Sequence, residues 1–525
     1  MATTATRSNY WIVTTTSTTT PVFNFRYIVE VVIGGVVKAT LKQPKNNAGS
    51  AHFNIERIVK NYTTVTNKHA NTITGAVSYN SIHLMPRNIP NPSAGSNVDY
   101  AISKNEGTCR LVTLRFYEEF ASTDGGVIGR VDEDIDVTFA FINYANEWED
   151  QMNFKFELYA PRLTTPYEKF LSKIPYVTTQ PNDTSGMIAH LTGAGDYRTL
   201  SWLNEQTTYF STGAIGFQYK FYSETPNADL SNHTGQIYIP NTATYGGVVS
   251  SDATGDEDEM LLFIAAGYEN VAKMKYVDLG GYQMQTTDKY YTISVGNETR
   301  SSYDDSIRKD VSSARLGDRI YIAETGDTDW IAMGAASNNT QTLFIVSAVG
   351  SGTGKYFPFI SNPSSQYIKP LLFEISQCSK YPSQSVAWKN KFGTWDYHYF
   401  NNNSNESISM NRSIEYERNP GSWNSAAFSI DSFERGKVQS VNGTKQITVN
   451  TGYLDEAYND YFKGMMQSND IQLIAPVEVG DDGVLQEPVP LILIDSQFQY
   501  KTTVKDKLIQ YSFTFQYAHN LKRMI

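Results

Sequence analysis

The final 80 residues constrain the fold more than any other segment of this chain. An amphipathic helix is predicted over 453–466, and apolar or alternating aromatic strands are predicted over 489–494, 498–500 and 509–517. Because the chain ends shortly after the last strand, we expect its end to form the edge of a packed β-domain. This segment offers no nucleophile, metal cage or phosphate loop, so it points to a protein that works through shape and assembly.

The composition of the whole chain also favours β structure. The sequence has 525 residues, of which 40% are hydrophobic and 18% charged, and it contains 35 Tyr and 26 Phe. Aromatic residues and the abundant Thr suit the pleated, half-buried surface of a sheet. We therefore predict a mainly β fold, with several β-sandwich or barrel-like domains and a few short helices.

The charge balance argues against direct binding of nucleic acid. The net charge is −11, and no Lys/Arg cluster is present to displace counterions from phosphates. Cys109 and Cys378 are expected to be free thiols in a reducing compartment. No secretory signal is visible, and no apolar run approaches the ~20 residues that a membrane-spanning helix needs.

The pattern along the chain predicts four parts. These are an N-terminal arm over 1–20, a β-rich domain over 21–175, a β-rich central domain or insertion over 176–370, and a C-terminal β domain over 371–525 that carries the helix at 453–466. Short strands separated by Gly, Asn and Ser indicate a sandwich or barrel-like arrangement in the central part.

The strongest local signal is a hairpin near the start of the second part. Apolar residues alternate from Phe23 to Ile33, and Gly34–Gly35 supplies a turn that accepts positive φ. A short helix is predicted over 55–62, with Asn54 as its cap.

The Thr-rich N-terminal arm contains three apolar residues, Tyr10, Trp11 and Ile12. Two interpretations remain open for it. The arm is either flexible or becomes ordered against a neighbouring subunit. In the second case these three residues are the candidate interaction residues.

The motifs that resemble catalytic or ligand-binding signatures fail at particular positions. The glycine-rich run at 350–355 resembles a phosphate-binding loop, but Val349 stands where the first glycine is required and Tyr356 where Ser or Thr is required. Asp132, Asp134 and Asp136 begin like a calcium loop. Such a loop then requires a glycine where Val137 stands and a glutamate where Asn143 stands. A calcium site of another kind stays open.

No cofactor, metal or catalytic residue is predicted from the remaining titratable side chains. The seven histidines form no zinc-binding pair, and neither cysteine lies beside a histidine in the sequence. The run of four acidic residues at 256–259 is expected to be a hydrated loop. Two carboxylates of a glycosidase leave no sequence trace, so a polysaccharide hydrolase remains an alternative.

Several blocks at both ends of the chain resemble structural proteins of tailed phages, notably those of marine and Bacteroidetes hosts. The blocks cover about half of the chain, and the segment 176–370 lies outside them. They are 23–44, 53–62, 110–122, 391–400, 413–421, 449–479 and 499–520. They are aromatic packing patterns, and no catalytic residue carries over with them.

The resemblance implies a non-enzymatic virion component, located in the tail region and assembled in the host cytoplasm. A tail or baseplate component is expected, such as a ring adaptor, a hub or a fibre-attachment subunit. Its implied partners are other tail, baseplate or portal-proximal proteins, and copies of itself in a ring or trimer. The alternatives are an adsorption protein that binds a receptor or a host surface glycan, and a capsid decoration or head-fibre protein.

Overall fold

The structure is a computed structural model, and the prediction of a mainly β fold with a few short helices is confirmed. None of the sheets formed by the described residues closes into a barrel. The described residues are 2–5, 11–15, 22–62, 83, 102–105, 109–142, 158–159, 171–175, 187–205, 215–227, 230, 232–240, 259–272, 274, 282–297, 309–314, 316, 319–340, 342–358, 370–376, 380–391, 393–417, 421–424, 427–430, 436–474, 488–495, 497–501, 508–518 and 521–524.

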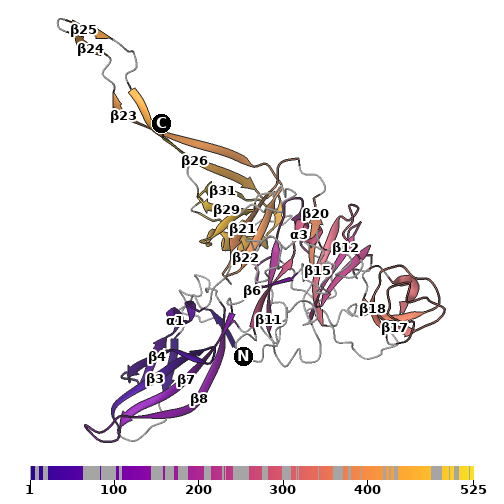
Figure 1. The fold of residues 1–525 in the computed structure, drawn as a ribbon, viewed down its shortest axis with the longest axis horizontal. Helices are drawn as coiled ribbons and strands as arrows, with labels where there is room; N and C mark the ends of the chain where they lie inside the picture. Colours follow the sequence, from indigo (N-terminus) through magenta and orange to yellow (C-terminus); the bar gives the residue numbers. More distant parts are fainter. Residues whose placement is uncertain are drawn as a thin grey trace. The chain divides into compact units, whose positions relative to one another are not determined.

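The chain divides into two compact units. Unit 1 comprises Met1–Gln377, Lys389–Asp396 and Pro476–Leu485. Unit 2 comprises Cys378–Trp388, Tyr397–Ala475 and Gln486–Ile525. Figure 1 shows the elements of both units. The finer division at residues 20, 175 and 370 stays a prediction.

The N-terminal part of unit 1 contains a six-stranded sheet. In spatial order its strands are β4 (Val36–Pro44), β3 (Phe23–Ile33), β7 (Cys109–Ala121), β8 (Gly129–Ile142), β1 (Ala2–Ala5) and β9 (Leu158–Tyr159). The predicted hairpin is confirmed as β3 and β4. Gly34 and Gly35 connect them with φ of 62° and 67°, which are values that glycine adopts without strain.

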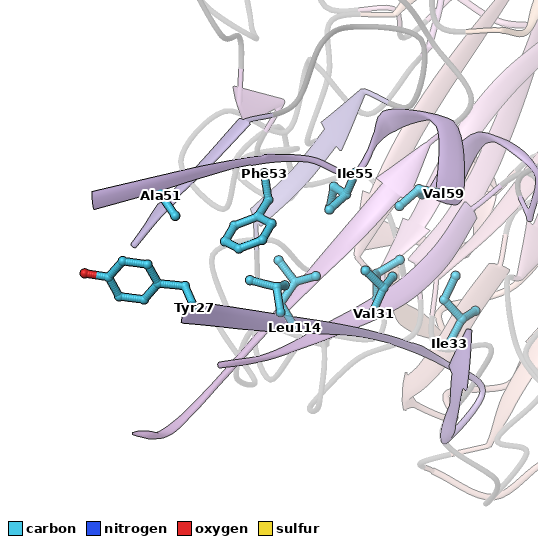
Figure 2. Close-up of a cluster of buried hydrophobic side chains, with 10 residues drawn as sticks. Tyr27, Val31, Ile33, Ala51, Phe53, Ile55, Val59 and Leu114 are labelled. Carbon is cyan, nitrogen blue, oxygen red and sulfur yellow. The ribbon is translucent and has the colours of Figure 1, made fainter. Parts of the chain in front are cut away.

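One face of this sheet is covered by a second layer. It consists of a two-stranded sheet of β2 (Trp11–Thr15) and β5 (Ser50–Asn54), followed by α1 (Glu56–Lys60). Figure 2 shows the resulting core, whose buried members are Tyr27, Val29, Val31, Ile33, Ala51, Phe53, Ile55, Val59, Val112 and Leu114. The odd-numbered residues of β3 fill this core, as their alternation in the sequence predicts.

Two further sheets of unit 1 pack face to face as a sandwich. One contains β10 (Ala189–Thr192), β20 (Leu371–Ile375), β15 (Tyr290–Asn297), β12 (Ile215–Tyr222) and β13 (Gly235–Pro240). The other contains β11 (Thr199–Glu205), β14 (Glu259–Ala265) and β6 (Ile102–Asn105), and α3 (Tyr268–Ala272) follows β14. The Trp202 and Phe217 rings meet edge to face between the sheets, and the Tyr219 hydroxyl donates to the Ala265 carbonyl at 2.7 Å.

A small four-stranded sheet completes the described part of unit 1. Its strands are β16 (Lys309–Asp310), β19 (Lys355–Pro358), β17 (Arg319–Glu324) and β18 (Leu343–Ile345), and a 3-10 turn, Val311–Ser313, follows β16. Its core is built around Trp330, which is fully buried with Ile320, Ile322 and Val346.

An eight-stranded sheet lies mainly in unit 2. In spatial order it contains β22 (Trp395–Phe400), β21 (Gln384–Lys389), β28 (Ile471–Ile474), β29 (Val489–Leu493), β31 (Ser512–Tyr517), β26 (Gly436–Asn450) and β23 (Asn405–Glu417), with β32 (Leu521–Met524) also paired to β26. The helix α5 (Tyr458–Met466) packs on it through Phe462, whose ring lies 5.1 Å from that of Phe513. Two small pairs complete the unit: β27 (Leu454–Asp455) with β30 (Leu508–Ile509), and β24 (Gly421–Asn424) with β25 (Ala427–Ile430).

Two sequence predictions in this region need correction. The helix predicted over 453–466 begins only at Tyr458, because Leu454 pairs with Ile509 in a short antiparallel bridge. The strand predicted over 498–500 is not a strand. Its aromatic residues pack locally instead, and the Lys501 amide that follows donates to the Asn459 side chain at 3.2 Å.

Candidate functional site

The predicted interaction residues of the N-terminal arm fall on or beside β2. Trp11 pairs with Asn54 and Ile12 with Phe53, so the backbone of 11–15 forms an antiparallel ladder with β5 of the same chain. Tyr10 lies outside the described residues. A role of these three residues in contacts between subunits stays a prediction.

The glycine-rich run at 350–355 is used by the protein for its own packing. Asp327 accepts hydrogen bonds from the Thr353 amide at 2.5 Å and from the Thr353 hydroxyl at 2.9 Å, and these bonds lower the pKa of the Asp327 carboxyl. The Gly354 amide donates to the Thr328 hydroxyl at 2.9 Å. Backbone amides that would cradle a phosphate in a nucleotide-binding loop are therefore bonded to neighbouring side chains here.

Gly354→Ala should destabilise this small sheet. A Cβ atom at Gly354 would lie 2.5 Å from the Trp330 ring and 2.9 Å from the Thr325 carbonyl oxygen. Because a buried indole and backbone must move, we expect a loss of about 2 kcal/mol in the free energy of unfolding. Urea unfolding followed by Trp fluorescence measures it. Gly129→Ala is the matched control, since a Cβ atom there meets nothing within 4 Å, and equal losses in both variants would contradict the packing argument.

The three aspartates that begin like a calcium loop lie within β8, where the register of its pairing with β7 shifts between Arg115 and Tyr117. Asp132 and Asp136 pair with Tyr117 and Arg115 across β7 and β8, an extended geometry that differs from the tight loop of an EF-hand. No cluster of three or more metal-ligating side chains occurs among the described residues. Of the acidic run at 256–259, only the backbone of Glu259, in β14, is described.

The histidines are dispersed through the structure. His83, His190 and His398 are buried, whereas His52 is exposed on β5 and His233 contacts the Leu230 carbonyl. His69 and His519 lie outside the described residues. Burial and, to a smaller extent, the charge of Arg198 lower the pKa of His190 to about 3, so this imidazole is neutral at physiological pH.

The buried carboxyl group of Asp396 in unit 1 is hydrogen-bonded to residues of the segment 171–174. Asp396 accepts a hydrogen bond from the Ser172 hydroxyl at 2.5 Å, and the Lys173 amide lies 3.4 Å from its other oxygen. Asn390 donates to the Leu171 carbonyl at 2.8 Å beside it. Burial raises the pKa of Asp396 to about 6 despite these bonds. The group fixes the segment 171–174 in place.

The feature of unit 2 that stands out is the pairing of β23 with β26. The two strands form a ladder from Asn405↔Thr448 to Glu417↔Gly436. On its other side β26 pairs with β31 over 446–450 and with β32 over 440–443. The sheet therefore supports the hairpin only at its base.

Beyond Ser440 the hairpin continues without a third described strand. The segment 413–440, called the ribbon below, contains the ends of β23 and β26 and the small antiparallel pair of β24 and β25. In Figure 1 β23 and β26 run out side by side past β31. Two-stranded β structure of this kind is marginally stable by itself in water.

At the base of the hairpin, the face of the sheet that forms the core of unit 2 continues onto β23 with apolar side chains. Ile447 is buried and pairs with Phe515 on one side and Glu406 on the other. Paired residues share a face of the sheet, so the even-numbered residues of β23 continue this core face. Ile408 and Met410 on that face are 51% and 50% exposed.

Unit 2 also contains a cavity of about 440 Å³ beside α5. Its lining residues are Met466, Asp495, Gln497, Phe498, Gln499, Lys501, Tyr511, Ser512 and Phe513. The Phe498 and Tyr511 rings stack with centroids 5.2 Å apart, and the Tyr511 hydroxyl bonds to the Asn459 side chain and, at 2.8 Å, to the Gln499 carbonyl. Gln497 and Gln499 are exposed at its rim.

The sequence predicts strands at 414–418 and 437–449, within or beside β23 and β26, but it predicts neither the full hairpin nor the cavity of unit 2. The first half of β23 was not predicted, although the alternation of Ile408 and Met410 with serines is a period-2 signal. The cavity has no local signal, because its walls come from α5, the loop at 495–501 and β31. No helix in the described part of the chain is long and apolar enough to cross a membrane. No protein-family model, curated protein or solved structure matches the chain.

Proposed function

We propose that this protein is a non-enzymatic structural subunit that joins a larger assembly through the β23–β26 hairpin. The ribbon is the observation that carries the proposal. A two-stranded extension with an apolar face at its base gains stability when another protein covers it. A chain that acts alone has little use for such an extension, which leaves strand edges open to aggregation.

The assembly we propose is the virion of a tailed phage, with the chain in the tail or baseplate as a ring adaptor, hub or fibre-attachment subunit. The blocks that resemble phage structural proteins support this, and three of them, 413–421, 449–479 and 499–520, include parts of the ribbon, β26, α5 and β31. Such a protein is assembled in the host cytoplasm with other tail or portal-proximal proteins.

The test is incorporation of a shortened chain into phage particles. Residues 413–440 are replaced by Asn-Gly, which joins Arg412 to Val441 with a two-residue hairpin turn. The intact chain should be found in purified particles by mass spectrometry. The shortened chain should fold, as shown by an unchanged melting temperature, and should be lost from particles at least about tenfold, as expected when central interface residues are removed.

Ile331→Ser is the control, because Ile331 is a 55% exposed apolar residue in the turn between β17 and β18 of unit 1. It should enter particles like the intact chain. Absence of the intact chain from particles, or normal incorporation of the shortened one, would refute the proposal.

The cavity in unit 2 favours a second candidate function, binding of a host surface glycan. Aromatic faces beside amide and carboxylate groups suit the apolar faces and hydroxyls of sugars. Phe498→Ala should then reduce binding of the chain to host cells or their purified polysaccharide, whereas Phe23→Ala, at a 40% exposed aromatic of unit 1, should not. Equal binding by both variants would remove this candidate.

A further inference from the structure

The outer edge of β23 is open at the base of the hairpin. β23 is the last strand in the spatial order of its sheet, and among the described strands only β26 pairs with it. From Asn405 to Ser413 the ladder is regular, and the register shifts between Ser413 and Tyr416. Irregularities of this kind commonly end strand pairing. The regular part of the edge is therefore nine residues long, and Ser409 is its centre.

The side chains of this segment are complementary to themselves when the strand is reversed about Ser409. The reversed strand places Glu406 opposite Arg412, Ile408 opposite Met410, and Ser407 opposite Asn411. The first two pairs lie on the face that continues the core, and they match opposite charges and apolar groups. Shifting the centre to Ile408 or Met410 would remove the Glu406–Arg412 pair.

The edge also lacks the usual protection against pairing. From Asn405 to Arg412 the edge contains no Pro and no Lys, the residues that most often block edge strands, and its two charged residues, Glu406 and Arg412, are the ones that the reversed strand places opposite each other. All eight of these residues are exposed, including Ile408 and Met410. Glu406 already holds Lys445 at 2.8 Å through one oxygen and accepts from the Tyr517 hydroxyl at 2.8 Å through the other, but each carboxylate oxygen has a further acceptor position for the guanidinium of a second chain.

We propose that β23 pairs antiparallel with β23 of a second copy of this chain, about a two-fold axis at Ser409. The inference rests on the proposed function as a structural subunit and names one of its partners. The pairing joins the two eight-stranded sheets edge to edge and leaves the ribbon of each copy available for other proteins of the assembly.

Cysteine cross-linking of the full chain tests the register directly. A two-fold axis at Ser409 brings the two copies of this residue to a Cα separation of about 5 Å, within the range of a disulfide. Under mild oxidation S409C should therefore form a covalent dimer. S407C is the matched control, because the two copies of position 407 would be four residues apart along the paired strands, or about 13 Å. We expect at least about tenfold more dimer for S409C.

Charge reversal gives a second, reversible measurement. R412E places a carboxylate opposite Glu406 at both ends of the pairing, and E406R places two guanidinium groups together in the same way. Each variant alone should weaken the dimer about tenfold or more in analytical ultracentrifugation. An equimolar mixture should restore it, because each Glu of one copy then meets an Arg of the other. Circular dichroism confirms that each variant is folded.

Equal cross-linking of S409C and S407C, or failure of the mixture to restore the dimer although both variants fold, would overturn this pairing. If the chain is present in phage particles and S409C does not cross-link, the pairing alone is wrong. If S409C cross-links and the chain is absent from particles, the proposed function alone is wrong.

Discussion

Phe513→Asp should unfold most of unit 2 at room temperature. Phe513 is 2% exposed on β31, and its ring contacts those of Phe462, Tyr511 and Phe400 at centroid distances of 5.1 to 6.4 Å. Aspartate removes these contacts and places a charge among aromatic side chains. We expect a loss of roughly 4 kcal/mol or more in the free energy of unfolding, measured by urea titration of the purified chain.

Two variants make this result interpretable. Ser512→Asp adds the same charge one residue earlier, at an exposed position, and should change stability by less than about 0.5 kcal/mol. Phe25→Asp should have an intermediate effect, because Phe25 is only half-buried and Lys45 lies 3.7 Å above its ring. If Phe513→Asp stays soluble and folded with the stability of Ser512→Asp, the described core of unit 2 is wrong.

Local patterns predicted those elements in which local preference and packing agree. The β3–β4 hairpin is one, since alternating apolar residues and two glycines specify strand, turn and strand together. The short helix predicted over 55–62 forms over Glu56–Lys60.

Tertiary contacts decided the elements that local patterns missed. The first turn of the predicted helix at 453–466 is replaced by a bridge to β30, whose residues lie more than 50 positions away. Tyr500 lies in an alternating aromatic segment but donates to Asp460 on α5 instead of entering a strand. β23 is an edge strand because it is the last strand in the spatial order of its sheet. The sequence of a single strand does not specify its position in that order, so this edge could not be predicted.

Acid should destabilise unit 1 through His190. Its pKa is about 3 in the folded chain and about 6.5 in an unfolded one. As the pH falls below 6.5, the unfolded chain therefore binds a proton that the folded chain does not, and stability is lost progressively until the pH reaches about 3. At pH 4.5 the loss from this group is about 2–3 kcal/mol relative to pH 7.

Asp396 acts in the opposite direction over much of the same range. Its pKa is about 6 when folded and near 3.8 when unfolded, so the folded chain takes up this proton first. Its contribution rises as the pH falls from about 6 to 4 and reaches about 2 kcal/mol at pH 4.5. The two groups nearly offset each other, and the intact chain should show little net effect from them between pH 7 and 4.5.

Single substitutions of His190 and Asp396 should separate their opposite contributions to the pH dependence of stability. Relative to the intact chain, His190→Gln should gain stability on acidification because the proton-linked loss is gone, and Asp396→Asn should lose it because the compensating gain is gone. Hydrogen exchange of the β10 and β22 amides at pH 7 and 4.5 measures these differences, and comparison with the parent chain cancels the other titrating groups. If both variants follow the parent chain at both pH values, neither group is buried as described. If they diverge in the expected directions, protonation of the buried Asp396 carboxyl offsets the acid-linked loss that arises at the neutral buried His190 imidazole.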